Sequence, residues 1–192
     1  EETYSYVAVK AGYVTKKDTI SVTEDTEKTI TMEKAPESTR KDVSAAWKNF
    51  RNSDDNMGIT SAKTPTSEAT TYEKWFKKLG SGWGAAPSVQ IIVDNSLIVM
   101  SANHIYKLDL NTGDILQTGD MVAATNFGYT PPTYADGMIF APLADGRVQA
   151  FNAETLESLW VYQDTLKGQS LSPITYSDGY IYTGFWNAET KD

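Results

Sequence analysis

The chain has 192 residues, of which 22% are charged and 40% hydrophobic, and its formal net charge at pH 7 is -8. This length is enough for one large domain or two small ones with a buried core. The negative charge argues against nucleic-acid binding, because phosphate contacts need clustered Lys and Arg. The absence of cysteine excludes disulfides, thiolate catalysis and thiolate metal sites. No apolar run is long enough to predict a membrane-spanning helix.

The N-terminal part of the chain alternates between apolar and polar residues. Two pairs of apolar residues are each spaced by two positions, Ile20 with Val22 and Ile30 with Met32, and an acidic turn separates the pairs. This period, with many Thr, Val, Ile and Tyr residues, predicts three short strands. Three strands are too few for a stable sandwich. We therefore interpret residues 1–35 as the last strands of an immunoglobulin-like β module.

One phrase of this region resembles a known class of module. YVAVKAGY (6–13), followed by ISV and KTITM, is similar to the last strands of PEGA-type or prealbumin-like modules. Such modules belong to bacterial surface proteins. The resemblance implies an extracellular or cell-surface protein of a bacterium. The chain begins without a basic and apolar leader, so we expect either a cytosolic protein or a processed piece of a longer one.

Residues 36–46 are predicted to be a linker with helix-compatible character. Val43, Trp47 and Phe50 would form an i, i+4, i+7 stripe on a helix. The cluster Asp54-Asp55-Asn56 follows in a polar, turn-rich stretch. It lacks the alternating ligands and the distal Glu of a calcium loop, so we expect a solvated loop and no metal site.

The second part of the chain repeats a phrase with a period of 42 residues, marked by Asp94, Asp136 and Asp178. Each phrase has a proline, a β-prone run, an Asp-Asn or Asp-Gly turn and a second β-prone run. The phrases are PSVQIIVDNSLIV (87–99), PPTYADGMIFAPL (131–143) and SPITYSDGYIYTG (172–184). The turn pairs tolerate positive φ and suit tight hairpins. A fixed period of this length is typical of a β-propeller or another repeat array.

Four strands can be placed in each of two repeats. The predicted strands are about 87–93, 96–102, 104–110 and 114–118, then 131–135, 138–143, 147–152 and 157–163. Four antiparallel strands in one period make one propeller blade. The predicted fold class is therefore all-β.

A second repeated phrase lies at the end of each predicted blade. KLDLNTGDILQ (107–117) and AFNAETLESLW (150–160) align without a gap and together approach A-x-D-x-x-T-G-x-x-x-W. In this pattern the Asp or Asn and the Thr bond a tight turn, and the indole lies against the neighbouring blade. Four positions depart from the pattern, namely Lys107, Gln117, Asn152 and Leu156. Trp75 continues the spacing backwards, because it precedes Gln117 by 42 residues.

These phrases resemble the tryptophan-docking repeat of the PQQ-like (quinoprotein-type) β-propellers. The segment around Trp47, WKNFR, is similar to the entry segment of the same propellers, so the resemblance covers residues 47–192. It implies about 3 to 3.5 blades, whereas a propeller closes with about four to eight. We expect an excised piece of a longer protein, or several copies that self-associate through open blade edges.

The resemblance leaves two functions open, because the fold does not determine the activity. Some PQQ-like propellers are quinoprotein dehydrogenases that hold PQQ and calcium over the propeller axis, and others are scaffolds without a cofactor. The single histidine, His104, lies at a tight turn, and no nucleophile motif accompanies it. We predict no catalytic, cofactor-binding or metal residues and a non-enzymatic scaffold or binding protein. The alternative is a fragment of a PQQ- and calcium-dependent dehydrogenase.

Three aromatic residues in predicted loops are candidates for contact with a partner. They are Trp83, Tyr129 and Trp186. Large amphipathic rings are common at binding surfaces. The expected partner is a protein or a glycan.

Overall fold

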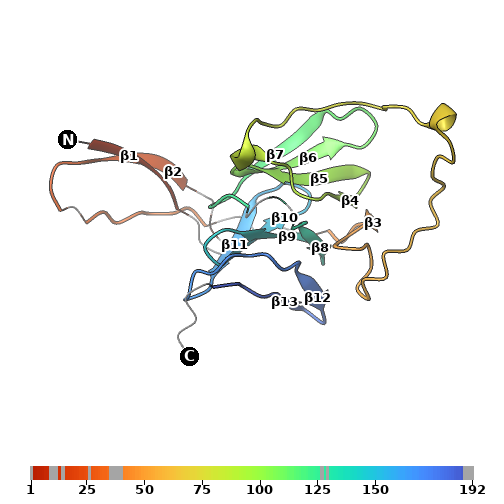
Figure 1. The fold of residues 1–192 in the computed structure, drawn as a ribbon. Coiled ribbons are helices and arrows are strands. Elements are labelled where there is room, and N and C mark those ends of the chain that lie inside the picture. The colour runs from red at the N-terminus through yellow and green to blue at the C-terminus, as the bar shows by residue number, and fades with distance from the viewer. Residues whose placement is uncertain are drawn as a thin grey trace.

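The computed structural model describes residues 2–8, 13, 16–25, 27–34, 41–125, 128 and 130–187. These residues form strands, turns and two short 3-10 turns, η1 (Glu68–Thr70) and η2 (Trp83–Ala85). The predicted all-β class is confirmed (Figure 1). No helix of the described residues is long and apolar enough to cross a membrane.

Two four-stranded antiparallel units and the start of a third follow one another along the chain. The first blade is β4 (Ile91–Val93), β5 (Ser96–Ser101), β6 (His104–Asp109) and β7 (Ile115–Asp120), the second is β8 (Thr133–Ala135), β9 (Met138–Leu143), β10 (Arg147–Asn152) and β11 (Ser158–Gln163), and the third begins with β12 (Thr175–Ser177) and β13 (Tyr180–Tyr182). Within each blade, neighbours in sequence are neighbours in the sheet. This order is that of propeller blades, and the propeller is incomplete.

The hydrophobic cores lie between blades. One cluster joins residues of the first and second blades, including Ile91, Met100, Ile139 and Phe151, all of which are completely or almost completely buried. A second cluster joins the second blade to the third. Each blade therefore buries its sheet faces against its neighbours, as stacked repeats do.

The predicted hairpin turns are present where the period places them. Asp94, Asp136 and Asp178 have φ values of 46°, 50° and 49°. This left-handed region costs little for Asp and Asn and matches the twist of the flanking strands. The repeated aspartates are therefore turn residues.

The repeated turns at the outer strands are also built as the sequence predicts. Oδ1 of Asp109 accepts hydrogen bonds from the backbone N–H groups of Asn111 and Thr112, at 2.7 and 2.9 Å. These bonds lower the pKa of Asp109, because they favour the carboxylate. Oδ1 of Asn152 accepts the equivalent bonds in the second blade.

The indole of Trp75 docks on the turn of the first blade. Its Nε1 donates to the carbonyl of Leu110 at 3.1 Å, and a Cβ added to Gly113 would lie 2.5 Å from the ring. In the second blade Leu156 stands where Gly113 stands in the first, and Gln117 replaces the docked Trp. Leu156 is buried with φ at 56° and packs against Gly119 of β7. The leucine side chain thus fills space that an indole fills at the first turn.

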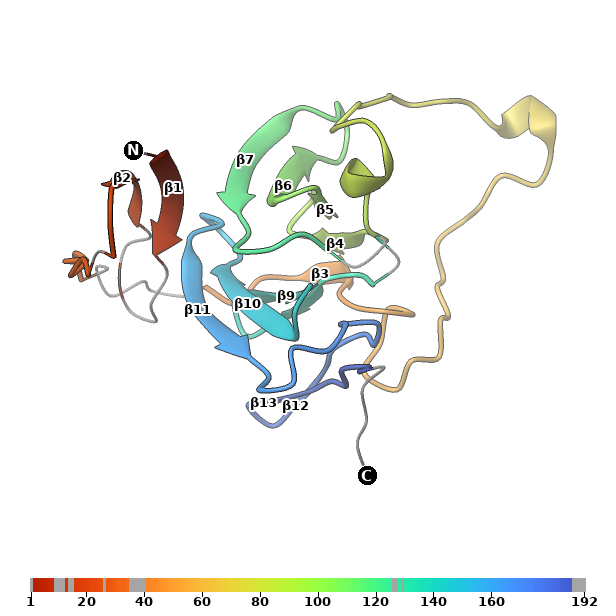
Figure 2. The same cartoon turned by 60° about the vertical axis from the view of Figure 1, so that its left-hand side comes forward.

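The region before the first blade contains one strand and a long segment without strands. Residues 41–47 do not form a helix; Ala45–Trp47 is a strand, β3, that pairs with the innermost strand β4. Backbone pairing with β4 outweighs the weak helical stripe of Val43, Trp47 and Phe50. Residues 48–90, all described, contain no strand and run as a long excursion (Figure 2). The described residues therefore hold two blades and the first hairpin of a third, and the propeller is incomplete, as predicted.

The N-terminal part is a separate hairpin. β1 (Glu2–Ala8) pairs with β2 (Lys16–Val22) in a sheet of their own beside the blades, and Lys17 of β2 contacts Asp120 of β7 (Figures 1 and 2). The third predicted strand does not form, because residues 27–34 contribute only an isolated bridge between Lys34 and Tyr13. The immunoglobulin-like assignment of residues 1–35 stays a prediction.

Gly113→Ala should destabilise the protein more than Gly179→Ala. Both glycines have positive φ, but a Cβ at Gly179 meets nothing within 4 Å. We expect the control to lose about 1 kcal/mol from backbone strain. Gly113→Ala should lose about 1–3 kcal/mol more from the clash with Trp75. Urea unfolding measures both losses.

Replacing Trp75 by Ala as well should reduce the cost of Gly113→Ala to that of the control, because the two positions are coupled. Equal losses for the two single glycine variants would contradict the docking contact.

Candidate functional site

The blades have two ends with different connections. At one end, termed the turn end, tight hairpins join β4 to β5, β6 to β7, β8 to β9 and β10 to β11. At the other, termed the loop end, residues 121–132 and 164–174 lead from one blade to the next. Loops held by a rigid scaffold commonly carry binding residues. The loop end is therefore the candidate surface.

Trp83 lies at the loop end and points into solvent. It begins η2, which follows Gly82 with φ at 75°. The hydroxyl of Ser101, at the end of β5, donates to the carbonyl of Ala85 at 2.7 Å and holds this turn on the first blade. The Trp83 side chain is 88% exposed. A large aromatic ring is thus displayed on a turn that the sheet anchors.

Tyr129 lies outside the described residues, but its neighbours on both sides are placed. The carbonyl of Gly128 accepts a hydrogen bond from the N–H of Val89 at 3.2 Å. Oγ1 of Thr130 donates to the carbonyl of Ser170 at 3.4 Å. The connection that contains Tyr129 therefore contacts the loops before and after it.

Trp186 lies at the loop end of the third blade. It exchanges two backbone hydrogen bonds with Gln169, at 2.7 and 2.9 Å. Its side chain is 55% exposed. The pairing ties the start of the third blade to the connection that leaves the second.

The structure thus places Trp83 and Trp186 at the same end of the array, over different blades. The described residues show no ring contact between them. The segments that carry them are linked through Gly128, Thr130 and the 169–170 stretch. The two indoles are therefore separate exposed rings on one row of loops.

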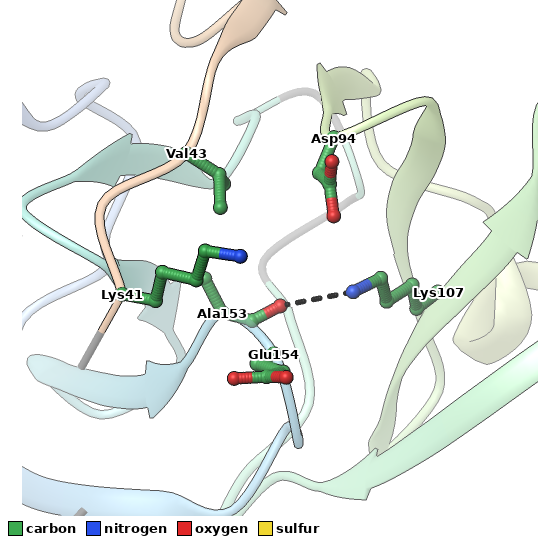
Figure 3. A pocket seen from close by; sticks show the side chains of 6 residues that line it. All are labelled: Lys41, Val43, Asp94, Lys107, Ala153 and Glu154. Carbon is green, nitrogen blue, oxygen red and sulfur yellow. Dashed lines mark hydrogen bonds between the residues drawn. The ribbon is translucent and has the colours of Figure 1, made fainter. Parts of the chain in front are cut away.

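A small pocket at the turn end was not predicted from the sequence. Its volume is about 40 Å³, and Figure 3 shows the side chains that line it: Lys41, Val43, Asp94, Lys107, Ala153 and Glu154. Nζ of Lys107 donates to the carbonyl of Ala153 at 3.4 Å. Because one water needs roughly 10–15 Å³ of such a volume, the pocket can hold a few waters or a small ion and is too small for an organic substrate. The only sign of this pocket in the sequence was Lys107, which replaces the Ala of the repeat pattern.

Tyr134 of β8 binds the residues on either side of β3 to the second blade. The sequence did not predict this role. The hydroxyl of Tyr134 donates to Oδ1 of Asp42 at 2.7 Å and accepts from the N–H of Val43 at 2.7 Å. Its own N–H donates to the carbonyl of Lys48 at 2.7 Å. Burial raises the pKa of Tyr134 to about 12, and the bond to Asp42 acts in the same direction. The residue therefore keeps β3 against the inner strands.

The polar groups singled out from the sequence lie close to other protein groups. Asp54 accepts a hydrogen bond from Nζ of Lys48 at 2.6 Å, and Asp55 accepts one from Ser53. Nδ1 of His104 lies 3.2 Å from Asp120, which Lys17 of the N-terminal hairpin also contacts. In the described part of the chain, no three His, Cys, Asp or Glu residues are grouped as metal ligands.

Fold and surface together define a β-propeller with an aromatic-bearing loop end. The family model described as outer membrane protein assembly factor BamB matches residues 66–185. The chain belongs to this family of PQQ-like propellers. No curated protein sequence matches the chain.

One solved structure shows the same fold at low identity, and two others give lower TM-scores. The quinohemoprotein alcohol dehydrogenase ADHIIG from Pseudomonas putida HK5 superposes with a TM-score of 0.60 at 20% identity, over 75% of this chain and 23% of that protein. BamB from Moraxella catarrhalis gives a TM-score of 0.45 at 20% identity, over 58% and 37% of the two chains. A europium-containing methanol dehydrogenase gives 0.37 at 22% identity, over 52% and 22%. The chain thus spans less than a quarter of the alcohol dehydrogenase.

The described residues do not fit PQQ and its metal. Such a site needs oxygen ligands that converge on one ion, and the described residues provide no such group. The inner edge of β4, which would border the axis, is already paired with β3. The inner strands themselves are largely apolar, with the sequences IIV and TYA. The fold is shared with the alcohol dehydrogenase, but the described residues form no group of His, Cys, Asp and Glu that could hold a metal.

Tyr134→Phe should loosen β3 without unfolding the blades. The variant leaves the N–H of Val43 and the carboxylate of Asp42 without their partner, at a cost of about 1–3 kcal/mol. Hydrogen exchange should speed up at the amides of residues 43–47 and stay unchanged in β9 and β10. Equal exchange in both proteins would contradict the role of Tyr134.

The stability difference between Tyr134→Phe and the natural protein should depend on alkaline pH. The folded pKa of Tyr134 is raised above the ordinary value of 10 to about 12. The contribution of Tyr134 to the free energy of unfolding is therefore complete below pH 10 and is lost as pH rises towards 12. Urea unfolding at pH 8 and at pH 11 should show a smaller difference at the higher pH.

Proposed function

We propose that this chain is part of a non-enzymatic scaffold protein of the bacterial envelope that binds another protein through the loop end of its propeller. The observation that carries this proposal is the Trp83 side chain, which is 88% exposed on an anchored turn. An exposed indole on a rigid scaffold offers a large contact area at little entropic cost. Trp186 adds a second such point over another blade.

The family supports a protein as the partner. Its description names an assembly factor of the outer membrane, and assembly requires contact with other proteins. An extracellular or cell-surface location belongs to the same proposal. It rests on the resemblance of residues 1–35 to the strands of bacterial surface modules, and the β1–β2 hairpin is compatible with it.

The dehydrogenase alternative is less well supported by the described residues. The likeness to the alcohol dehydrogenase is one of fold, at 20% identity. Catalysis through PQQ would need metal ligands near the inner strands, where β3 and Tyr134 lie instead. The aromatic residues at the loop end serve binding without requiring a reaction.

Trp83→Ala and Trp186→Ala should each weaken binding of the partner at least about tenfold, because exposed indoles are frequent binding hot spots. A photo-crosslinking residue at position 83 or 186, introduced in the source bacterium, should capture the same protein. Affinity is then measured with that purified protein by calorimetry. The matched control is Tyr4→Ala, an aromatic residue on the N-terminal hairpin that is 52% exposed.

Three results decide between the functions. Loss of affinity in both tryptophan variants, with none in the control, supports a protein-binding loop end. Binding to an array of glycans, with loss in the same variants, would replace the protein by a glycan. Dye-linked alcohol oxidation after addition of PQQ and calcium to the complete protein would overturn the proposal.

A further inference from the structure

The connections that lead into the inner strands carry no charged residue, although 22% of the chain is charged. No Asp, Glu, Lys, Arg or His occurs in three stretches, residues 79–93, 121–135 and 168–177. Each stretch begins as a connection at the loop end and continues into the innermost strand of a blade, β4, β8 or β12. We term the described residues of these connections, 80–90, 121–125, 128, 130–132 and 168–174, the neutral surface.

Hydrogen bonds join the three parts of the neutral surface. The N–H of Val89 donates to the carbonyl of Gly128 at 3.2 Å, and Oγ1 of Thr130 donates to the carbonyl of Ser170 at 3.4 Å. The three parts therefore lie side by side at one end of the blades. Their large exposed apolar side chains are Trp83 (88% exposed), Val89 (46%) and Leu171 (40%).

The turn end of the same blades is charged. Every tight hairpin of the two complete blades carries at least one carboxylate there. These acids are Asp94, Asp109, Asp114, Asp136, Glu154 and Glu157. The charges of the loop end lie instead at the middle and outer strands, where Asp145 pairs with Arg147 at 2.7 Å and Asp120 contacts Lys17. Neutrality is therefore a property of one surface and not of the chain as a whole.

Several polar side chains of the neutral surface are already used within the protein. The hydroxyls of Ser88 and Ser170 donate to the carbonyls of Val89 and Leu143, at 2.9 and 2.6 Å. Nε2 of Gln90 donates to the carbonyl of Ser88 at 2.8 Å. Hydroxyl-rich ligands such as sugars gain most from charge-assisted hydrogen bonds, which a surface without charges does not offer. The neutral surface is thus better suited to apolar contact with a protein than to a glycan.

We propose that the protein partner of the loop end docks on the neutral surface with an uncharged segment rich in apolar and aromatic residues. This inference rests on the proposed function and specifies the chemistry of its partner. A charged side chain buried on this surface would lose its water without gaining a counter-charge. An apolar segment avoids that cost and buries its surface against Trp83, Val89 and Leu171. The neutral surface therefore selects its partner by rejecting charge.

A random peptide library displayed on phage tests the chemistry of the partner. The library is selected on the natural chain and, in parallel, on Trp83→Ala. Peptides that need Trp83 should contain fewer Asp, Glu, Lys and Arg residues than the starting library. The affinity of the most enriched peptide, measured by calorimetry, should change by less than about twofold between 0.05 and 0.5 M salt, because it makes no ion pair that salt could screen.

Charge placed on the neutral surface tests the same point from the side of the chain. Val89→Glu and Val89→Lys introduce either sign, and Val89→Gln is the matched uncharged control. Both charged variants should bind the enriched peptide at least about tenfold more weakly than the control, because each charge loses water without a partner. Val89→Gln should bind within about threefold of the natural chain. Thermal unfolding of the three variants verifies that the fold is kept.

Three results would overturn the inference and leave the proposed function standing. The first is a set of peptides that need Trp83 but are rich in charged residues. The second is an affinity that falls steeply with salt. The third is a pair of opposite effects, in which one of Val89→Glu and Val89→Lys strengthens binding and the other weakens it.

A library that yields no peptide dependent on Trp83 would overturn both the inference and the proposed function. Binding to an array of neutral glycans in its place, with loss in Trp83→Ala, would show that the ligand is a sugar.

Discussion

The structure depends on the packing of one blade against the next. Ile91 of the first blade and Ile139 of the second belong to the same buried cluster, so neither sheet has a core of its own. A four-stranded sheet of this size cannot bury both faces alone. Burial of apolar surface is therefore shared between repeats, and each repeat stabilises its neighbours. The docked Trp75 and the buried Leu156 extend this packing to the turns.

The need to pair every strand edge also explains the position of β3. The inner edge of β4 would present unpaired backbone groups, and β3 covers that edge. Tyr134 of the second blade bonds the segment just before β3 and the residue just after it, so a single strand connects both blades at their inner side. A chain that uses its own strand in this place has less room for a ligand there. Contacts with other molecules are consequently left to the blade ends and outer surfaces.

The sequence predicted what depends on local chemistry and period. The turns at Asp94, Asp136 and Asp178 follow from residues that tolerate positive φ, and the eight blade strands follow from the runs between the turns. The role of residues 41–47 could not be predicted, because β3 is held by pairing with β4, a distant partner, against a weak helical pattern. Trp83 and Trp186 are exposed, and their contact with a partner stays a prediction. The pocket beside Lys107 could not be predicted, because it depends on how the blades meet.

Residues that recur in every blade serve the fold, whereas a residue that occurs once needs another explanation. The turn aspartates recur because each hairpin needs them. Trp83 and Trp186 do not recur: one period after Trp83 stands Thr125, and one period before Trp186 stands Ala144. Blade packing therefore does not require an indole at either place, and both indoles are largely in solvent. A large apolar ring that the scaffold does not need, held at the loop end, supports the proposed contact with another molecule.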